Sequence, residues 1–188
     1  MNIMTKIGKA LEPEYKSYFD KISSKEEKYL NAKKLIISDV DGILTESSSY
    51  YTADGKVMKK FGAYDTEMIN FMKTQGWDFL FVSKDKNGLE ITKRRIQDLK
   101  CVFNEADVNT RIDIIKDKKS IYDFVVYIGD SLSDIALFRE ADFGATVNNA
   151  PDIVKEYSQY VAKHNGGFGG FADICFYLHY KVFFPFQI

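Results

Sequence analysis

The sequence predicts an α/β fold in which a Rossmann-like parallel sheet has helices on both faces and carries a small β-hairpin flap. Short apolar runs alternate along the chain with segments whose apolar residues have helical spacing, which is typical of repeated βα units. The strongest apolar runs end abruptly in polar loops, as buried parallel strands do. An Asp-Gly pair between two aromatic and β-branched arms predicts the hairpin.

The elements of the first half follow from apolar runs and turn signals. The run at 35–37 predicts a central strand, and the arms on either side of the Asp-Gly pair predict a hairpin over 50–61. Helical spacing over 66–75, stopped by Gly76, predicts a helix. The run at 79–82 predicts a second buried strand.

The second half continues the same alternation up to residue 157. Strong or short apolar runs predict strands, and polar segments with helical spacing between them predict helices, the last of which begins with a proline in its first turn. In chain order, we expect a helix at 86–99, a strand at 102–103, a helix at 111–118, strands at 124–128 and 143–147 around a helix at 134–140, and a helix at 151–157.

Length and composition favour one compact domain that needs no disulfides. The chain has 188 residues, of which 45% are hydrophobic. Its 26 basic and 27 acidic residues give a net charge of −1, so neither a nucleic acid nor an anionic membrane is an expected partner. Cys101 and Cys175 lie in apolar settings without metal-ligand spacing, which predicts core residues in a reducing compartment.

The two ends of the chain differ in character from the α/β domain predicted over 33–178. Residues 1–32 are polar with apolar residues at near-helical spacing, which predicts an N-terminal helical extension. They lack the apolar stretch of a signal peptide or membrane span, so we expect a cytoplasmic protein. Residues 179–188 form an apolar tail, expected to be a strand or tail that packs on its own domain or on a neighbouring subunit.

Acidic loops follow two of the strongest strands, at 39–42 and at 129–134, and Ser83 ends a third. In open α/β sheets ligands bind outside the carboxyl ends of the strands, so these groups are expected to converge. Carboxylates brought together repel one another unless a cation holds them, and ligation by oxygen alone suits Mg²⁺. A single Asp after a strand is often only a helix cap or turn residue, but the joint pattern favours a functional site.

These residues resemble the haloacid dehalogenase superfamily of phosphotransferases. The first motif is similar to 39–45, the second contains Ser83, the fourth is similar to 129–134, and the resemblance covers about 33–177. The short intervals between motifs leave no room for a separate cap domain. The hairpin, 61–65 and 164–170 resemble the cap-less group typified by 3-deoxy-D-manno-octulosonate 8-phosphate phosphatase. That resemblance implies a homo-oligomer, a tetramer in which flaps and neighbouring tails complete the pocket.

The resemblance also implies a role for each motif residue. Asp39 would be the nucleophile that forms an aspartyl-phosphate, and Asp41 would protonate the leaving group and then activate water. Mg²⁺ would be held by Asp39, the backbone carbonyl of Asp41 and Asp130. Asp134 would act nearby, as a ligand through water or as an orienting group, and Ser83 would bind phosphoryl oxygens.

The third motif departs from the superfamily pattern, because the lysine that stabilises the phosphoryl charge is not plainly present. Arg111 is the best substitute in the expected region, and Lys116 is the fallback. Arginine supplies the positive charge through a wider, planar group, so the two side chains are not equivalent.

Other departures concern the substrate. The cap-less sugar-phosphate enzymes have arginines that would grip a sugar acid's carboxylate, and this chain has lost them, which weakens the case for that substrate. The altered positions are Tyr64-Asp65-Thr66 in place of Arg-Asp-Gly, Ser83-Lys84-Asp85 in place of Thr-Gly-Arg, and Ala172 in place of an arginine.

The sequence therefore predicts an Mg²⁺-dependent phosphatase that hydrolyses a small phosphorylated metabolite such as a sugar or sugar-acid phosphate. One alternative is a catalytically weak relative that serves as a regulatory or oligomerisation module, because the third-motif lysine is missing. Another is a nucleotide or polynucleotide-end phosphatase, against which the balanced charge speaks. A phosphoacceptor of the receiver type is disfavoured because such a domain has no use for an acid at Asp41.

Overall fold

The computed structural model describes residues 32–183, and every structural statement below concerns that part of the chain. Nearly all of the predicted N-terminal extension, and the tail beyond residue 183, lie outside the described residues, so both stay predictions. Six strands form one parallel sheet in the order β5-β4-β1-β6-β7-β8, which confirms the predicted fold. Their bounds are β1 Lys34–Asp39, β4 Trp77–Ser83, β5 Val102–Glu105, β6 Phe124–Ile128, β7 Phe143–Thr146 and β8 Tyr160–Val161.

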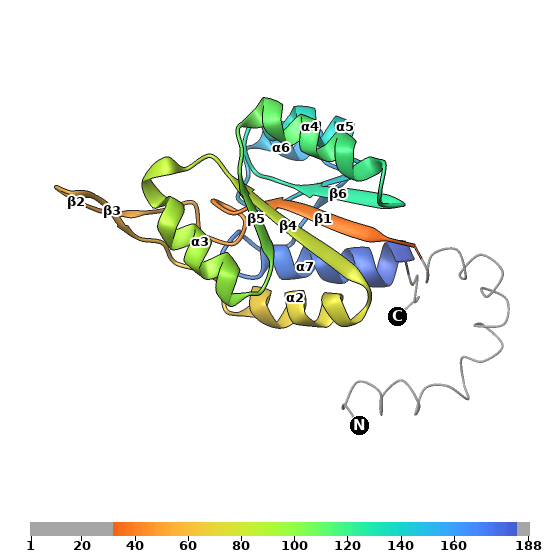
Figure 1. Ribbon diagram of the computed structural model, residues 1–188, viewed down its shortest axis with the longest axis horizontal. Helices are drawn as coiled ribbons and strands as arrows, with labels where there is room; N and C mark the ends of the chain where they lie inside the picture. Colours follow the sequence, from red (N-terminus) through yellow and green to blue (C-terminus); the bar gives the residue numbers. More distant parts are fainter. Residues whose placement is uncertain (1–31, 184–188) are drawn as a thin grey trace, which may run out of the picture. The chain divides into compact units, whose positions relative to one another are not determined.

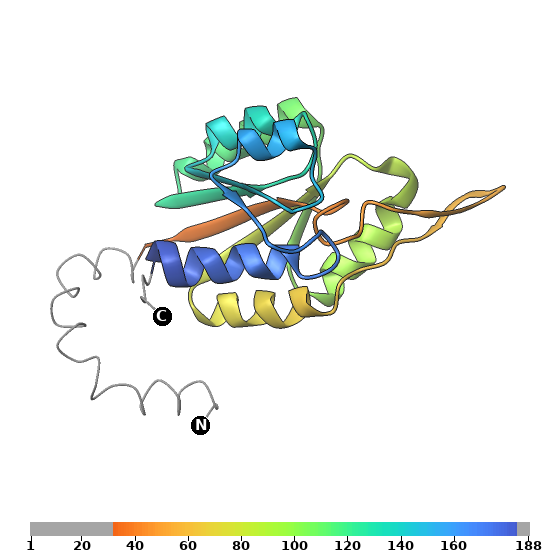
Figure 2. The ribbon, with the colours of Figure 1, turned by 180° about the vertical axis from the view of Figure 1, so that it is seen from behind.

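Helices cover both faces of the sheet, as predicted. Helices α2 (Tyr64–Thr74) and α7 (Gly170–Tyr177) lie side by side on one face (Figure 1). Helices α4 (Val108–Lys119), α5 (Asp134–Glu140) and α6 (Asp152–Glu156) lie on the opposite face (Figure 2). Helix α3 (Leu89–Asp98) follows the short 3-10 turn η1 (Lys86–Gly88) and is joined to α2 by a 2.6 Å hydrogen bond from its Arg95 to Thr66.

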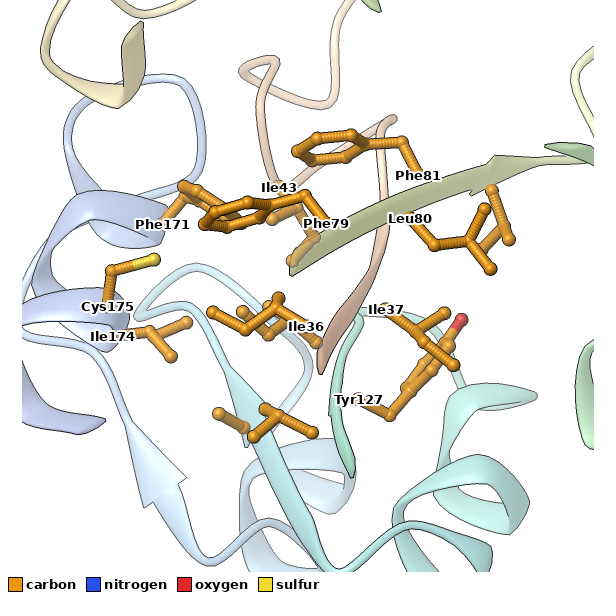
Figure 3. Close-up of a cluster of buried hydrophobic side chains, with 14 of the residues drawn as sticks. Ile36, Ile37, Ile43, Phe79, Leu80, Phe81, Tyr127, Phe171, Ile174 and Cys175 are labelled. Carbon is orange, nitrogen blue, oxygen red and sulfur yellow. The ribbon is translucent and has the colours of Figure 1, made fainter. Parts of the chain in front are cut away.

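The core fills both sides of the central strands, which is why these strands are apolar on both faces. On one side, Phe79 and Phe81 of β4 pack against Phe171 of α7, with ring centroids 6.2 and 5.9 Å apart. On the other side lie Ile37 and Tyr127, both fully buried. Figure 3 shows the two groups on opposite sides of the strands. Tyr127 therefore approaches the helices α4 and α5, where its hydroxyl needs a polar partner.

The predicted flap is a separate antiparallel pair, β2 (Tyr50–Thr52) and β3 (Gly55–Met58), that projects from the body of the domain (Figure 1). It is shorter than the predicted 50–61. Phe61 lies outside the hairpin. It forms a β-bridge with Thr45 and packs, partly buried, against the core. The chain must return to the sheet edge before α2 begins, and an apolar ring at this point gains more from the core than from the flap.

The region after residue 157 contains two elements that apolar periodicity does not predict, strand β8 and helix α7. Helix α7 continues into η2 (Leu178–Phe183), a wider helical segment, so the start of the predicted tail, residues 179–183, is helical and not a strand. Leu178 and His179 are buried, which shows that the start of the tail packs on its own domain. In the described part of the chain, no helix has the length and apolar character needed to cross a membrane.

Candidate active site

The predicted site residues meet at the carboxyl edge of the sheet, where three neighbouring strands end. Strand β1 lies between β4 and β6. Asp39 lies in register with Val82 of β4, one residue before Ser83. On the other side, β6 ends at Ile128, two residues before Asp130. Strands β4 and β5 lie on one side of β1, and the later strands β6, β7 and β8 lie on the other. The strand order therefore reverses at β1, and such a switch point at the carboxyl edge is where open α/β sheets bind ligands.

The carboxylate of Asp39 is largely buried at the end of β1. Its Oδ1 accepts a hydrogen bond from the backbone N–H of Val40 at 2.8 Å, and its Oδ2 accepts one from Arg111 at 3.1 Å. Burial raises the pKa of Asp39 to about 7; Arg111 opposes this rise, and the charge of Asp134 adds to it. Asp39 therefore needs nearby positive charge to be ionised at neutral pH.

Arg111, and not Lys116, lies beside Asp39. It belongs to the first turn of α4, whose N-cap is Asp107. Its side chain is 2% exposed and donates to Asp39 and to the hydroxyl of Tyr127 at 2.9 Å. Lys116 is exposed on the same helix. Burial of a guanidinium requires paired acceptors, and Asp39 is the acceptor that gives this arginine a position in the site.

Asp134 begins α5 and is fully buried. Its Oδ1 accepts a hydrogen bond from the Tyr127 hydroxyl at 2.9 Å, and its Oδ2 accepts two from Ser131, backbone N–H and hydroxyl, both at 2.8 Å. Burial, together with the charge of Asp134, raises the pKa of Tyr127 well above its ordinary value, so the phenol stays protonated and can donate. These donors hold the Asp134 carboxylate in one orientation.

Asp39, Asp130 and Asp134 each offer a carboxylate oxygen, and these oxygens lie within 4.8 Å of one another. Burial raises the pKa of Asp130 to about 6, and Asp134 contributes to the rise. Like charges this close are stable together only if they are protonated or neutralised by a cation. All the donors are oxygens, the ligands of hard divalent ions, so the residues present fit Mg²⁺.

The side chain of Asp41 lies apart from that cluster. Its Oδ2 accepts a hydrogen bond from the hydroxyl of Ser83 at 3.1 Å, and its Oδ1 lies 2.7 Å from the ammonium of Lys59. Asp41 and Asp39 thus have different partners although they are two residues apart. The arrangement therefore places the two carboxylates in different surroundings, Asp39 beside an arginine and Asp41 between a lysine and a serine.

Two glycines allow the loops around the site to approach one another. Gly42 has a φ of +87°, and a Cβ there would lie 1.9 Å from Oδ2 of Asp130. A Cβ on Gly166 would lie 1.7 Å from the carbonyl oxygen of Gly42. Any larger residue at either position would displace the loop after β1, which carries Asp41.

Sequence reasoning missed two site residues, Lys59 and Tyr127. Lys59 lies between the apolar arm of the hairpin and Lys60, and nothing in the sequence distinguishes the buried lysine from the exposed one. In the sequence, Tyr127 fits the pattern of the apolar residues that surround it in a buried strand. The signal available for it was a hydroxyl in an otherwise apolar run, because a buried phenol requires a hydrogen-bonding partner.

Comparison with known proteins agrees with this geometry. A family model of haloacid dehalogenase-like hydrolases matches residues 10–174. The 3-deoxy-D-manno-octulosonate 8-phosphate phosphatase of Haemophilus influenzae is 30% identical over 145 residues, which cover 75% of this chain and 79% of that protein. A cobalt-bound structure of the Haemophilus phosphatase superposes with a TM-score of 0.71 at 28% identity, covering 81% of this chain and 90% of the other.

A second solved structure is the same phosphatase from Moraxella catarrhalis, in complex with a magnesium ion, a phosphate ion and a 3-deoxy-D-manno-octulosonate molecule. It is 25% identical, with a TM-score of 0.71, and the match covers 84% of this chain and 92% of the other. The extent of the family match and the identity to a curated relative establish the relationship. This chain belongs to the haloacid dehalogenase-like hydrolases, in the group of phosphoric monoester hydrolases that resembles 3-deoxy-D-manno-octulosonate 8-phosphate phosphatase.

Proposed function

We propose that this protein is an Mg²⁺-dependent phosphatase that hydrolyses a small sugar or sugar-acid phosphate through an aspartyl-phosphate on Asp39. The main support for the proposal is that two carboxylates, only two residues apart, have different partners. Asp39 lies beside Arg111 and within the group of three acidic residues, whereas Asp41 lies apart and accepts hydrogen bonds from Ser83 and Lys59. A phosphomonoesterase that works through an acyl-phosphate needs one carboxylate as nucleophile and another as acid and base.

The chain's own residues account for each step. Ser83 and Arg111 bind the phosphoryl oxygens, and Asp39 attacks phosphorus while the bond to the leaving oxygen breaks. Asp41 gives that oxygen a proton, then takes a proton from the water that hydrolyses the aspartyl-phosphate. Tyr127 and Ser131 hold Asp134 in place. A bound Mg²⁺ supplies the positive charge that offsets the acidic group and the phosphate.

The position of Arg111 speaks against the alternative of a catalytically weak module. That alternative depends on the missing third-motif lysine, but a buried cation lies 3.1 Å from the nucleophile. Arginine retains the charge that stabilises a transferring phosphoryl group. The position of Arg111 therefore supports the proposal of an active hydrolase.

The substrate class rests on the relatives, whose names specify a phosphorylated eight-carbon sugar acid. Three positions argue for a different molecule within that class. Tyr64 is exposed, Ala172 has no charge, and Asp85 is engaged by Lys56 and Lys59, so none of them offers an arginine to a carboxylate. We infer that the natural substrate carries fewer negative charges away from its phosphate.

The test is a phosphate-release screen on the full chain with Mg²⁺. It uses a panel of phosphorylated sugars, sugar acids and nucleotides, with p-nitrophenyl phosphate as a generic ester. We expect release from p-nitrophenyl phosphate and a preference for a neutral sugar phosphate. Absence of release from every compound would contradict the proposal, and a preference for nucleotides would favour the alternative of a nucleotide phosphatase.

We also propose that the protein is a homotetramer and that the flap contributes to its interface. Tyr50, Tyr51, Val57 and Met58 expose large apolar surfaces on the hairpin, with Tyr51 61% exposed. A two-stranded hairpin with this much exposed apolar surface is unusual for a monomer. Light scattering at micromolar concentration measures the mass, and a mass of one chain with full activity would contradict this proposal.

A further inference from the structure

A buried lysine links the flap to the candidate general acid. Lys59 follows directly after β3, and its side chain is 0% exposed. Its ammonium lies 2.7 Å from Oδ1 of Asp41, 2.8 Å from Oδ2 of Asp85 and 2.8 Å from the hydroxyl of Thr92. These three partners come from the loop after β1, the loop after β4 and helix α3, so one side chain joins three elements.

Asp85 extends this contact to a chain of alternating charges. Its Oδ2 lies 2.5 Å from Lys56 and 2.8 Å from Lys59, so one carboxylate bridges a lysine of the flap and the lysine that follows the flap. Asp85 is itself the N-cap of η1, where its Oδ1 accepts the N–H of Gly88 at 3.3 Å. The order of charges from the flap to the site is therefore Lys56, Asp85, Lys59 and Asp41.

This arrangement has a cost that packing alone would not require. Taking an ammonium out of water costs several kcal/mol unless its donors are all satisfied. An ammonium has three donors, and Lys59 has a partner for each. An apolar side chain after β3 would attach the flap equally well, so the contact with Asp41 is the feature that calls for an explanation.

We propose that Lys59 is a positioning residue that fixes the carboxylate of Asp41 so that it faces the leaving group. This inference rests on the proposed function, in which Asp41 is the acid and base. Lys59 spans both oxygens of that carboxylate, since its ammonium lies 2.7 Å from Oδ1 and donates to Oδ2 at 3.0 Å, and Ser83 also donates to Oδ2. Two donors at fixed positions restrict rotation of the carboxylate, and the anchored flap holds one of them.

A misplaced acid slows some esters more than others, whereas a general loss of structure slows all esters equally. A leaving group that departs readily as an anion needs little help from an acid, whereas an alkoxide depends strongly on protonation. A variant whose Asp41 is misplaced should therefore be slowed more with an alkyl phosphate than with a nitrophenyl phosphate. A variant that is merely less well folded should be slowed equally with both.

The experiment compares kcat/KM for p-nitrophenyl phosphate and benzyl phosphate, two esters of similar size with leaving groups of very different quality. The variants are Lys59→Met and Lys59→Gln, with Asp41→Asn as the reference for loss of the acid. Lys93→Met is the matched control, because Lys93 is 47% exposed and pairs with Glu90 one turn earlier on α3. Thermal unfolding of every variant accompanies the kinetics.

We expect Lys59→Met to lose at least about tenfold more kcat/KM with benzyl phosphate than with p-nitrophenyl phosphate, because a positioned acid contributes about 10²–10⁴-fold. The loss should fall on kcat, and Lys93→Met should match the wild type. If Lys59→Met does not fold, Lys59→Gln, which retains a donor without the charge, takes its place with the same expectation.

An equal loss with both esters, or no loss, would overturn the role of Lys59. If Asp41→Asn nevertheless shows the selective loss, the proposed function stands and only this inference fails. If Asp41→Asn shows no selectivity, or the wild type hydrolyses neither ester, the assigned role of Asp41 fails and this inference fails with it.

Discussion

Replacing Arg111 tests whether an arginine acts as the missing third-motif cation. Its guanidinium donates to Asp39 at 3.1 Å, to the Tyr127 hydroxyl at 2.9 Å and to the carbonyl of Ala106 at 3.0 Å, and it is nearly inaccessible to water. Arg111→Met removes the cation and leaves Asp39 as a buried carboxylate close to Asp134. Breaking a buried ion pair by removing one partner costs about 3–5 kcal/mol of folding stability.

The folding stability that Arg111→Met loses should depend on pH, because it depends on the ionisation of Asp39. Burial already raises the pKa of Asp39 to about 7, and removing Arg111 raises it further because the arginine opposes that shift. Below pH 7, Asp39 in the metal-free variant is protonated and the cost of an unpaired charge is avoided. We therefore expect Arg111→Met to lose more folding stability at pH 8 than at pH 6. The total loss relative to the wild type at pH 8 should be about 3 kcal/mol.

The activity assay is kcat/KM for p-nitrophenyl phosphate with Mg²⁺, alongside urea unfolding at both pH values. Loss of one group that stabilises transition-state charge costs about 10²–10³-fold, which is the loss expected for Arg111→Met. Arg111→Lys should lose only about tenfold, because it keeps the charge but loses the planar fork that reaches three partners. Lys116→Met, on the exposed side of α4, is the control. An Arg111→Met enzyme with more than about a third of the wild-type rate at equal stability would refute the assignment.

Three further outcomes are expected. Asp39→Asn should abolish phosphate release because an amide is a poor nucleophile, and more than about a tenth of the wild-type rate at matched stability would contradict this. Excess chelator should abolish activity, and Mg²⁺ should restore it; full activity in chelator would rule out the metal. Burial raises the pKa of Asp39 to about 7 and that of Asp130 to about 6, so metal-free stability should fall as pH rises from about 4 to 7. Mg²⁺ should therefore raise the melting temperature more at pH 8 than at pH 5, and an equal rise at both would count against these carboxylates as its ligands.

The parallel sheet and its functional edge could be predicted because each depends on local patterns. Buried strands such as β1 and β6 are apolar along their length, and the residues that end them must lie at one edge of a parallel sheet. The same patterns predict that Asp39, Ser83 and Asp130 lie at one edge of the sheet, as they do. Arg111 could be named only as a substitute, because many polar residues follow β5 and its burial depends on how α4 packs.

The C-terminal elements could not be predicted in the same way. Strand β8 has two residues, too few for a periodic pattern, and α7 is apolar on most of its surface because it lies between α2 and the sheet. A helix that is apolar on most sides is difficult to distinguish from a buried strand by sequence alone. This ambiguity explains why a strand was one of the structures expected for the tail, whose residues 179–183 are helical.

The fold class, the order of the central elements and the acidic residues at the ends of their strands can all be predicted from the sequence alone. These depend on contacts between near neighbours and on the rule that parallel strands end at one edge. Only the tertiary structure decided which cations accompany the carboxylates. Lys59 and Lys60 are adjacent, yet one is buried against Asp41 and the other is exposed over Phe168. That choice depends on a balance of desolvation and pairing among residues far apart in the chain, which no local pattern records.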